Sequence, residues 1–357
     1  MAYITLNKNK LRENYEYLDK LFSNNKTRWA VVSKLLCGEK AYLKELISLG
    51  VKQICDSRVS NLKTVKSINP DIETMYIKPP AKRALKGVVE YADISFNTEL
   101  STIQLLSKEA ERQNKIHKVM IMIEMGELRE GVMRDDFIDF YSKVFELPNI
   151  EVVGVGTNLT CLYGVLPNED KLIQLSLYKQ LIEAKFNTKI PYVSGGSSVT
   201  IPLIFLNKMP SGINHFRVGE TLFLGTDVYH NTSIETMHND VIQFYAEIIE
   251  LMEKPKTPSG EMGVNVEGEA FEFEESGAIE YSYRAILDIG TLDVDTSHIK
   301  PANEGVEIMG ASSDMIVVDL GDNPNKLKVG NLLEFHLDYM GALRLLNSKY
   351  IDKKVVE

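Results

Sequence analysis

One lysine lies at a position where it could take part in a reaction. Lys34 closes the apolar run that begins at Trp29. A strand of this composition would be buried on both faces, so a charged end either reaches water or belongs to a site. An amine that is partly withdrawn from water has a lowered pKa, and in its neutral form it attacks carbonyl groups to form a Schiff base. Lys34 alone therefore allows two interpretations, a solvated strand end and a nucleophile.

Two later loops have the composition of a phosphate site. Ser194–Ser198 offers two glycines and three hydroxyls, and Arg217–Glu220 supplies a glycine behind another apolar run. Glycine lets the backbone approach an anion, and the N–H groups at the start of a helix bind it. A lysine that faces a phosphate suggests a Schiff base with pyridoxal 5'-phosphate (PLP), which supplies an electron sink. A sugar-phosphate aldolase with a Schiff-base lysine is the alternative.

The elements that must position these residues repeat along the chain. Amphipathic helical segments separate most of the apolar runs, for example 98–113, behind the candidate cap Asn97, and 172–186. Near-continuous apolar strands that alternate with helices pair in parallel, and eight such units close into an α/β fold, the (β/α)8 TIM barrel. A doubly wound open sheet is the alternative, although no Gly-x-Gly-x-x-Gly follows the first run. The eight expected strands are 29–33, 53–57, 74–78, 93–97, 118–124, 152–158, 192–196 and 215–219.

In such a barrel the chemistry gathers where the strands end. Polar residues end every one of the eight runs, and the loops after strands seven and eight are the usual phosphate cradle of this fold. Because the Ser194–Ser198 loop lies across the barrel mouth from Lys34, we interpret it as a phosphate site. The predicted rim consists of Lys34, Asp56–Arg58, Lys78, Asn97, Glu124–Arg129, Thr157–Asn158, Ser194–Ser198 and Arg217–Gly219.

The alternation of apolar runs and helical segments ends after about Thr226, and a mainly β domain is expected to follow. Strand-like runs occur at 279–289, 306–309, 315–320, 332–338 and 348–351, behind an acidic, Pro- and Gly-rich segment at 254–276. We therefore expect a barrel domain over 8–226 and a C-terminal β domain over 227–357.

Composition excludes several other classes of protein. With 357 residues, 44% hydrophobic residues and a net charge of −10, the chain is expected to be globular and to bind neither nucleic acid nor membrane. Its three cysteines, Cys37, Cys55 and Cys161, have no metal-type spacing, so we expect no metal site. The odd count and the lack of signal-peptide features at the start favour the cytoplasm.

At this point the motifs resemble a known family, the alanine racemase class of fold-type III PLP enzymes, most closely its ornithine/amino-acid racemase branch. The resemblance spans nearly the whole chain. It implies a PLP barrel, a C-terminal β domain that the strand within 1–7 joins, and a head-to-tail homodimer with active sites built from both chains. The matching segments are Ala30–Lys34, Gly126–Gly131, Gly156–Cys161, Ser194–Ser198, Phe216–Glu220 and Met309–Asp314.

The resemblance also implies a role for individual residues. Lys34 would hold PLP as a Schiff base, and Arg217 would face the pyridine nitrogen. A guanidinium stays protonated, so that nitrogen must accept the hydrogen bond. Asn158 would lie over the ring and Arg129 near the ring hydroxyl, although Arg129 could instead pair with Glu124 or Glu127. The phosphate would contact Ser197, Ser198, Gly219, Glu220 and, from the β domain, Tyr339, unless this is an ordinary strand aromatic.

The sequence departs from the family at the second proton donor. Racemisation needs a proton donor on both faces of the α-carbon, and Thr291 stands at or near the place of the tyrosine that alanine racemase uses opposite its lysine. A threonine hydroxyl is too weak an acid. Cys161 is the thiol candidate, and Asp314, Asp293 and Asp295 are carboxylate candidates. These three aspartates could alternatively bind the distal ammonium of a basic substrate.

The leading prediction is therefore a PLP-dependent racemase of a free basic amino acid, ornithine-like or lysine-like. A PLP aldolase or decarboxylase on the same fold is the second interpretation. A non-catalytic PLP-binding homeostasis protein is the third, against which the expected β domain counts, because such relatives stop at the barrel.

Overall fold

The computed structural model describes residues 2–264, 268, 270 and 280–357 and divides the chain into two compact units. The larger unit runs from Lys8 to Asn239. The smaller unit combines the residues up to Asn7 with those from Asp240 onward.

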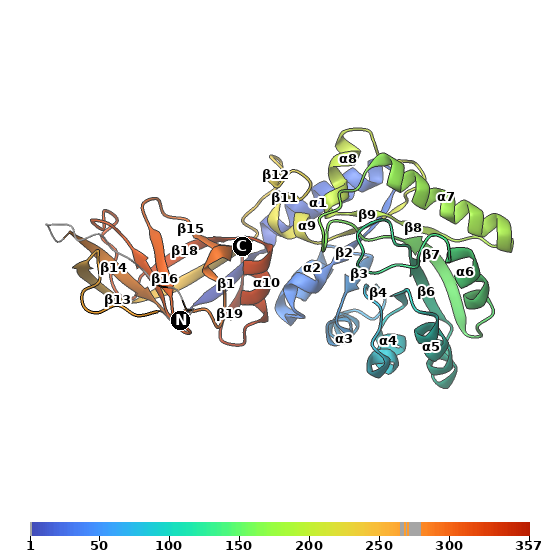
Figure 1. Ribbon diagram of the computed structural model, residues 1–357, viewed down its shortest axis with the longest axis horizontal. Helices are drawn as coiled ribbons and strands as arrows, with labels where there is room; N and C mark the ends of the chain where they lie inside the picture. Colours follow the sequence, from blue (N-terminus) through green and yellow to red (C-terminus); the bar gives the residue numbers. More distant parts are fainter. Residues whose placement is uncertain (1, 265–267, 269, 271–279) are drawn as a thin grey trace. The chain divides into compact units, whose positions relative to one another are not determined.

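A parallel sheet forms the centre of the larger unit, and it contains all eight predicted strands (Figure 1). Every neighbouring pair is parallel, in the order β8-β7-β6-β5-β4-β3-β2-β10-β9. The strands are β2 (Arg28–Val32), β3 (Gln53–Asp56), β4 (Glu73–Tyr76), β5 (Ile94–Asn97), β6 (His117–Met122), β7 (Ile150–Gly156), β8 (Tyr192–Ser194), β9 (Gly196–Ser197) and β10 (His215–Val218).

The sheet closes because one stretch of chain serves both edges. β8 pairs with β7, and β9, which begins two residues after β8 ends, pairs with β10. Gly196 makes this closure possible, since a Cβ there would lie 2.3 Å from the ring of Phe216. The prediction of a parallel α/β barrel is confirmed.

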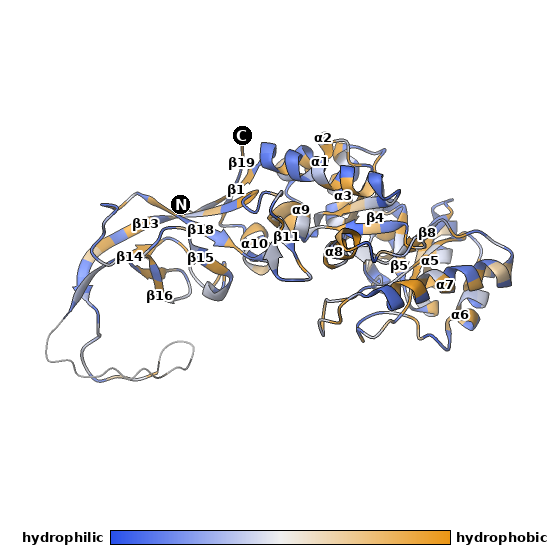
Figure 2. Cartoon of the chain, turned by 90° about the horizontal axis from the view of Figure 1, so that it is seen from above, coloured by the Kyte–Doolittle hydropathy of each residue, from blue (hydrophilic) through white to orange (hydrophobic). Residues whose placement is uncertain are grey.

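Helices surround the barrel on the outside (Figure 1). They carry hydrophobic and hydrophilic residues together (Figure 2) and turn the former inward, as α5 does with Ile103, Leu106 and Ala110. The helices are α1 (Lys8–Asn24), α2 (Lys40–Ser48), α3 (Val59–Ile68), α4 (Leu85–Tyr91), α5 (Leu100–Arg112), α6 (Phe137–Phe145), α7 (Glu169–Phe186), α8 (Ile201–Phe205) and α9 (Glu220–Leu224).

The predicted helix cap at Asn97 is wrong. α5 begins after Glu99, whereas Asn97 is the last residue of β5. Its side-chain nitrogen donates to the carbonyl and the hydroxyl of Ser95, 2.8 and 2.9 Å away. The side chain is therefore committed to its own strand.

The smaller unit is mainly antiparallel sheet, as predicted, and β1 (Tyr3–Asn7) belongs to it. β1 pairs with β13 (Ile242–Pro255) and β19 (Asp352–Val356). The remaining sheet strands are β14 (Tyr281–Leu287), β15 (Ile299–Pro301), β16 (Glu307–Ala311), β17 (Ile316–Asp319) and β18 (Leu332–Leu337).

Three details of this unit differ from the sequence analysis. The strand expected at 348–351 is a bend, and β19 begins just after it. Tyr339 starts the helix α10 (Tyr339–Asn347) and is not a strand aromatic. The long central strand β13 was not predicted. Part of the acidic segment 254–276 lies outside the described residues, and within the described ones no helix is long and apolar enough to span a membrane.

Candidate active site

Lys34 lies at the carboxyl end of β2, in the short 3-10 turn Ser33–Leu36. A hydrogen bond of 2.8 Å from Ser33 Oγ to Asp56 Oδ2 holds the start of this turn. Asp56 is fully buried and accepts two further hydrogen bonds, from Arg58 N and Asn61 Nδ2. Lys34 itself is half-buried.

Arg217 lies on β10, the strand beside β2, where it pairs with Ala30. Its side chain is buried inside the barrel, with Nη1 2.8 Å from the carbonyl oxygen and 2.5 Å from Oγ of Ser194. Nη2 donates to the carbonyl of Thr157 over 2.8 Å. Burial lowers the pKa of Arg217, but a guanidinium starts high enough to stay charged. Among the described residues no hydrogen bond uses Nε, which leaves this donor for a ligand.

The two predicted phosphate loops meet in space. Ser198 Oγ lies 3.4 Å from the backbone nitrogens of both Gly219 and Thr221. Gly219 packs tightly on β2, because a Cβ there would lie 3.0 Å from the carbonyl oxygen of Val32. This contact brings the loop after β10 close to the strand that ends in Lys34. The Glu220 carboxylate reaches Thr226 Oγ1 at 3.5 Å, so only its backbone is suited to an anion.

Arg129 forms a bidentate ion pair with Glu130. It pairs with neither Glu124 nor Glu127, the two partners that the sequence analysis left open. Glu130 and Arg129 are both close enough to Arg217 to affect its pKa, so the three charges share one region of the barrel rim.

Glu127 instead organises the loop that carries Cys161. It is 1% exposed and accepts hydrogen bonds from the backbone nitrogens of five residues in the loop after β7. Burial by itself raises the pKa of Glu127, but these N–H donors outweigh it and lower the pKa to about 2. The Cys161 thiol is exposed on this clamped loop. The donors are Thr160, Cys161, Leu162, Tyr163 and Val165.

The barrel rim fits an anionic, hydrogen-bonding cofactor such as PLP. Asn158 Nδ2, at the end of β7, is buried and has no hydrogen-bond partner among the described residues. A buried donor without a partner is costly and indicates a ligand that the protein binds there. Together with Arg217 Nε and the Ser198–Gly219 loops, it provides the polar groups that a ring and a phosphate need.

Four other predicted site residues lie in the smaller unit, in two adjoining segments, whereas Tyr339 starts α10. Thr291 N donates to the carbonyl of Ser312, and a Cβ on Gly290 would lie 2.3 Å from Asp314 N. Thr291 and Asp314 are therefore close neighbours, and both are exposed.

Asp293 and Asp295 have different structural contacts. Asp293 Oδ1 accepts a 2.5 Å hydrogen bond from Ser348 Oγ and lines a hollow of about 370 Å³ together with Thr291 and Arg344. Asp295 caps a short 3-10 turn through the backbone and hydroxyl of Ser297, which lowers the pKa of its carboxyl. Asp295 is thus committed locally, whereas Asp293 faces an open hollow.

Several residues that shape the site were not assigned a role from the sequence. Thr157 and Ser194 appeared only as rim residues, yet they hold Arg217 in place. Ser33 and Asp56 fix the Lys34 turn, and Glu130 pairs with Arg129. For Thr157, Ser194, Ser33 and Asp56, the only signal in the sequence was their position at the end of a predicted strand.

The fold and the rim together define a class of protein, a parallel α/β barrel with a lysine at the end of its first barrel strand and a mainly β second unit. The chain belongs to the alanine racemase family, because residues 6–227 match the family described as "Alanine racemase, N-terminal domain". The predicted family is confirmed.

Relatives match along the whole chain. The chain is 38% identical to ornithine racemase of Acetoanaerobium sticklandii, covering 99% of each protein. It is 27% identical to lysine racemase of Thermotoga maritima, covering 98% of this chain and 97% of the relative. Among solved structures, alanine racemase from Bartonella henselae with covalently bound pyridoxal phosphate has a TM-score of 0.74 at 16% identity, covering 99% of each chain. D-threonine aldolase from Filomicrobium marinum has a TM-score of 0.72 at 13% identity, covering 99% of this chain and 91% of that one.

Proposed function

We propose that this chain is a PLP-dependent racemase of a free basic amino acid, with ornithine as the first candidate and lysine as the second. The observation that carries the proposal is the pairing of β2 and β10, which puts Lys34 and the buried guanidinium of Arg217 at neighbouring strand ends. The 38% identity to an ornithine racemase over 99% of both proteins supports the choice of substrate class.

Each barrel residue has a distinct task in this proposal. Bound PLP would supply an electron sink that makes the α-proton of an amino acid acidic. Lys34 would hold the cofactor through Nζ, and its amine would take and return the proton on one face of the α-carbon. Arg217 would offer Nε to the ring nitrogen and, because it keeps its proton, could only donate a hydrogen bond there. The weaker electron demand that results favours return of the proton over side reactions.

The remaining predicted contacts orient the cofactor. Asn158 would use its unpaired Nδ2 toward the ring, and Arg129 would contact the ring hydroxyl. The loops around Ser198 and Gly219, where hydroxyl and backbone N–H groups converge, would hold the phosphate. The complete phosphate set that we propose is Ser197, Ser198, Gly219, Glu220 and, from the smaller unit, Tyr339.

A second proton donor is needed on the face opposite Lys34. We propose the Cys161 thiol first and the Asp314 carboxylate second. Asp293, on its open hollow beside Thr291, is the first candidate for the distal ammonium of the substrate, and Asp295 is the second.

We propose that the enzyme works in the cytoplasm as a head-to-tail homodimer. Large apolar side chains on the loops that Glu127 ties together support a covering chain, since Leu128, Leu162 and Tyr163 are 68%, 57% and 70% exposed. Sedimentation of the purified chain at several concentrations tests the dimer, and a species of 40.3 kDa throughout contradicts it.

The activity is tested with single enantiomers of ornithine, lysine and alanine in heavy water. The purified holoenzyme should incorporate deuterium at the α-carbon and invert the configuration, fastest with ornithine or lysine. Retention of configuration with every amino acid contradicts the proposal, and release of an aldehyde or of carbon dioxide indicates the aldolase or decarboxylase instead.

The lysine assignment has a readout that does not depend on turnover. Borohydride reduction should attach the cofactor covalently to Lys34, and the Lys34→Ala variant should lose this mass adduct. Lys78→Ala is the matched control, because Lys78 follows β4 in the same barrel and burial lowers the pKa of its amine. An adduct that disappears in the Lys78 variant and persists in the Lys34 variant contradicts the assignment.

A further inference from the structure

A chain of hydrogen bonds leads away from Arg217 through the interior of the barrel. Ser194 Oγ contacts Arg217 Nη1 at 2.5 Å and His215 Nδ1 at 2.8 Å. On the other side of the imidazole, His215 Nε2 lies 3.2 Å from Oε1 of Gln53. Ser194 and His215 are completely buried, and Gln53 is 7% exposed.

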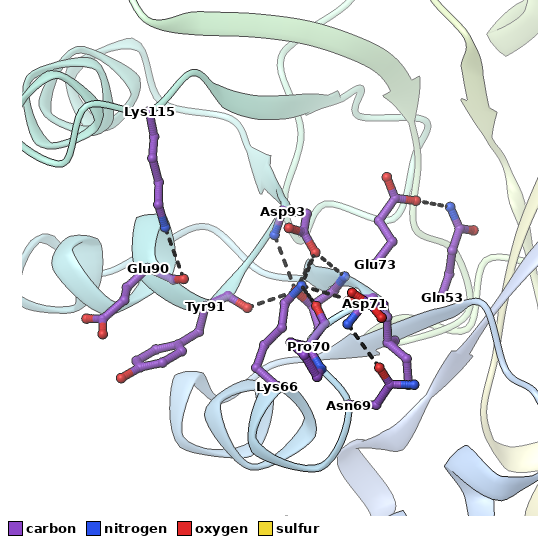
Figure 3. Close-up of polar contacts among 12 residues, drawn as sticks. Gln53, Lys66, Asn69, Pro70, Asp71, Glu73, Glu90, Tyr91, Asp93 and Lys115 are labelled. Atoms are coloured by element: carbon purple, nitrogen blue, oxygen red, sulfur yellow. Dashed lines mark hydrogen bonds and ion pairs between the residues drawn. The ribbon is translucent and has the colours of Figure 1, made fainter.

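The chain ends on a carboxylate. Gln53 Nε2 donates a short hydrogen bond to Glu73 Oε2 (Figure 3) and a second one of 2.9 Å to Tyr192 Oη. The Tyr192 hydroxyl donates to the same carboxylate oxygen over 3.3 Å. Glu73 is the first residue of β4, so it lies at the opposite end of the barrel strands from the Lys34 turn.

The two ends of this chain fix the direction of every bond between them. Arg217 can only donate, so Ser194 Oγ accepts from it, and the second lone pair of this oxygen leaves the direction of its bond to His215 open at this end. A carboxylate can only accept, so the Gln53 amide turns its nitrogen to Glu73 and its oxygen to His215. The neutral His215 must then carry its hydrogen on Nε2, so Nδ1 accepts the hydrogen of Ser194 Oγ. All four donors thus point from the cation toward the anion.

The histidine is suited to this neutral role. Burial lowers the pKa of His215 well below its usual value, and the charges of Arg217 and Arg28 lower it further. The imidazole therefore keeps one donor and one acceptor nitrogen at neutral pH, which is what a relay between a hydroxyl and an amide requires.

Arg217 needs such a connection because it is a buried cation. Its described hydrogen-bond acceptors are Ser194 and the carbonyl of Thr157, all of them neutral. A buried charge without a compensating partner is costly. A carboxylate in direct contact would compensate it but would compete for the donors that face a ligand. The charge of Glu130 raises the pKa of Arg217 from outside this chain, and a carboxylate at the far end of the oriented chain adds support while it leaves Nε available.

We propose that Ser194, His215, Gln53 and Glu73 are positioning residues that orient and electrostatically support Arg217 through one directional hydrogen-bond chain. The chain itself is a property of the folded barrel. Its effect on catalysis rests on the proposed function, in which Arg217 faces the ring nitrogen of the cofactor.

The first test measures the tautomer of His215 in the cofactor-free protein by ¹⁵N NMR of the imidazole nitrogens. We expect a single neutral tautomer protonated on Nε2. Glu73→Gln keeps the shape but lets the Gln53 amide turn either way, so both tautomers should appear. A wild-type His215 protonated on Nδ1, or a Glu73→Gln spectrum identical to the wild type, overturns the proposal.

The barrel contains one control for the carboxylate of Glu73 and one for the imidazole of His215. Asp93 is another carboxylate on this side of the barrel, bound to Lys66 and Thr74 and separate from the chain (Figure 3), so Asp93→Asn should leave His215 unchanged. His117 also begins a strand, is buried and contacts a serine, Ser95, at 2.7 Å, but its contacts lead to Asn97 and not to Arg217. A tautomer change in the Asp93 variant as well would mean a general loosening of the barrel and would overturn the proposal.

The second test uses the holoenzyme. Glu73→Gln and Gln53→Leu should each lower kcat by about tenfold, the effect of one lost buried hydrogen bond, with little change in KM, and should shift the absorption band of the bound cofactor. His117→Gln should do neither. Unchanged kcat and spectrum in both chain variants overturn the catalytic role. If the wild type racemises no amino acid, the proposed function fails, whereas the tautomer experiment still tests the hydrogen-bond chain.

Discussion

Ser33 donates a 2.8 Å hydrogen bond to the buried carboxylate of Asp56, and Ser33 directly precedes Lys34. The side chain expected to react is thus held from the neighbouring strand β3 and not only by its own strand. Burial raises the pKa of Asp56, while its hydrogen bonds from Arg58, Ser33 and Asn61 oppose the rise. The site therefore depends on a carboxyl group that no substrate needs to contact.

We expect Asp56→Ala to destabilise the protein by about 1–3 kcal/mol, because it leaves buried donors without an acceptor. The cofactor affinity should fall with it, since the Lys34 turn loses its support. Urea unfolding and titration with PLP measure the two effects. Asp71→Ala is the control, because Asp71 is exposed and should change neither quantity. Equal behaviour of the two variants would show that Asp56 does not hold the turn.

Glu127 should make the stability of the barrel depend on pH in the acid range. Its pKa of about 2 in the folded protein lies below the usual 4.5, so its contribution is complete above pH 4.5 and is lost as the pH falls toward 2. This shift corresponds to a contribution on the order of 3 kcal/mol at neutral pH. Glu127→Gln should lose this contribution, and its difference in unfolding free energy from the wild type should shrink between pH 5 and pH 3.

The control for this prediction is Glu109→Gln. The pKa of Glu109 is also lowered to about 2, mainly by its hydrogen bond to Arg112, but that arginine is largely exposed on α5. Salt screens such a surface pair, so the Glu109 variant should approach the wild type in 1 M NaCl, whereas the Glu127 variant should not. The same salt response in both variants would contradict a buried clamp at Glu127.

Gly290→Ala tests the close packing that makes Thr291 and Asp314 neighbours. The added Cβ would lie 2.3 Å from Asp314 N and 2.4 Å from its Cα, which the backbone cannot accommodate without moving. We expect a loss of about 1–3 kcal/mol in thermal unfolding. Gly310→Ala, where nothing lies within 4 Å of the new Cβ, should be nearly neutral. A Gly290 variant as stable as the Gly310 variant would contradict the contact between the two segments.

The positions of Lys34 and Arg217 could be predicted because parallel barrels place strand ends at one rim, and both residues end near-continuous apolar runs. β13 could have been found from the same kind of signal, since Ile242, Phe244, Ala246 and Ile248 alternate as buried residues along its first half. The acidic and basic residues in its second half hide this period.

The hydrogen bonds of Glu127 and those between Arg217 and Glu73 could not be predicted, because they join residues that are far apart in the sequence. Glu127 accepts N–H groups 33 to 38 residues further along the chain. The hydrogen-bond chain from Arg217 to Glu73 joins residues of β10, β8, β3 and β4, whose register no local pattern determines. A histidine at the start of a strand gives no sign, from its neighbours alone, that it will meet a serine on the adjacent strand.

The second proton donor is the last point that a variant can decide. Glu127 holds the loop of Cys161, with a hydrogen bond of 2.7 Å from Cys161 N, and Cys161 is an exposed free cysteine on this loop after β7. Asp314 is exposed in the smaller unit and accepts from the hydroxyls of Ser312 and Ser313. A proton donor contributes about 10²–10⁴-fold to the rate, so removing the correct one should lower racemisation by at least 10²-fold.

The decisive measurement separates exchange from inversion. If Cys161 is the donor, Cys161→Ser should still exchange the α-proton of one enantiomer with heavy water, through Lys34, but with retention of configuration. Asp314→Asn should keep inversion within a few-fold of the wild type. The opposite result, exchange without inversion in the Asp314 variant alone, would assign the role to the carboxylate. In that case the thiol of Cys161 is only a surface group on a loop that Glu127 holds for another purpose.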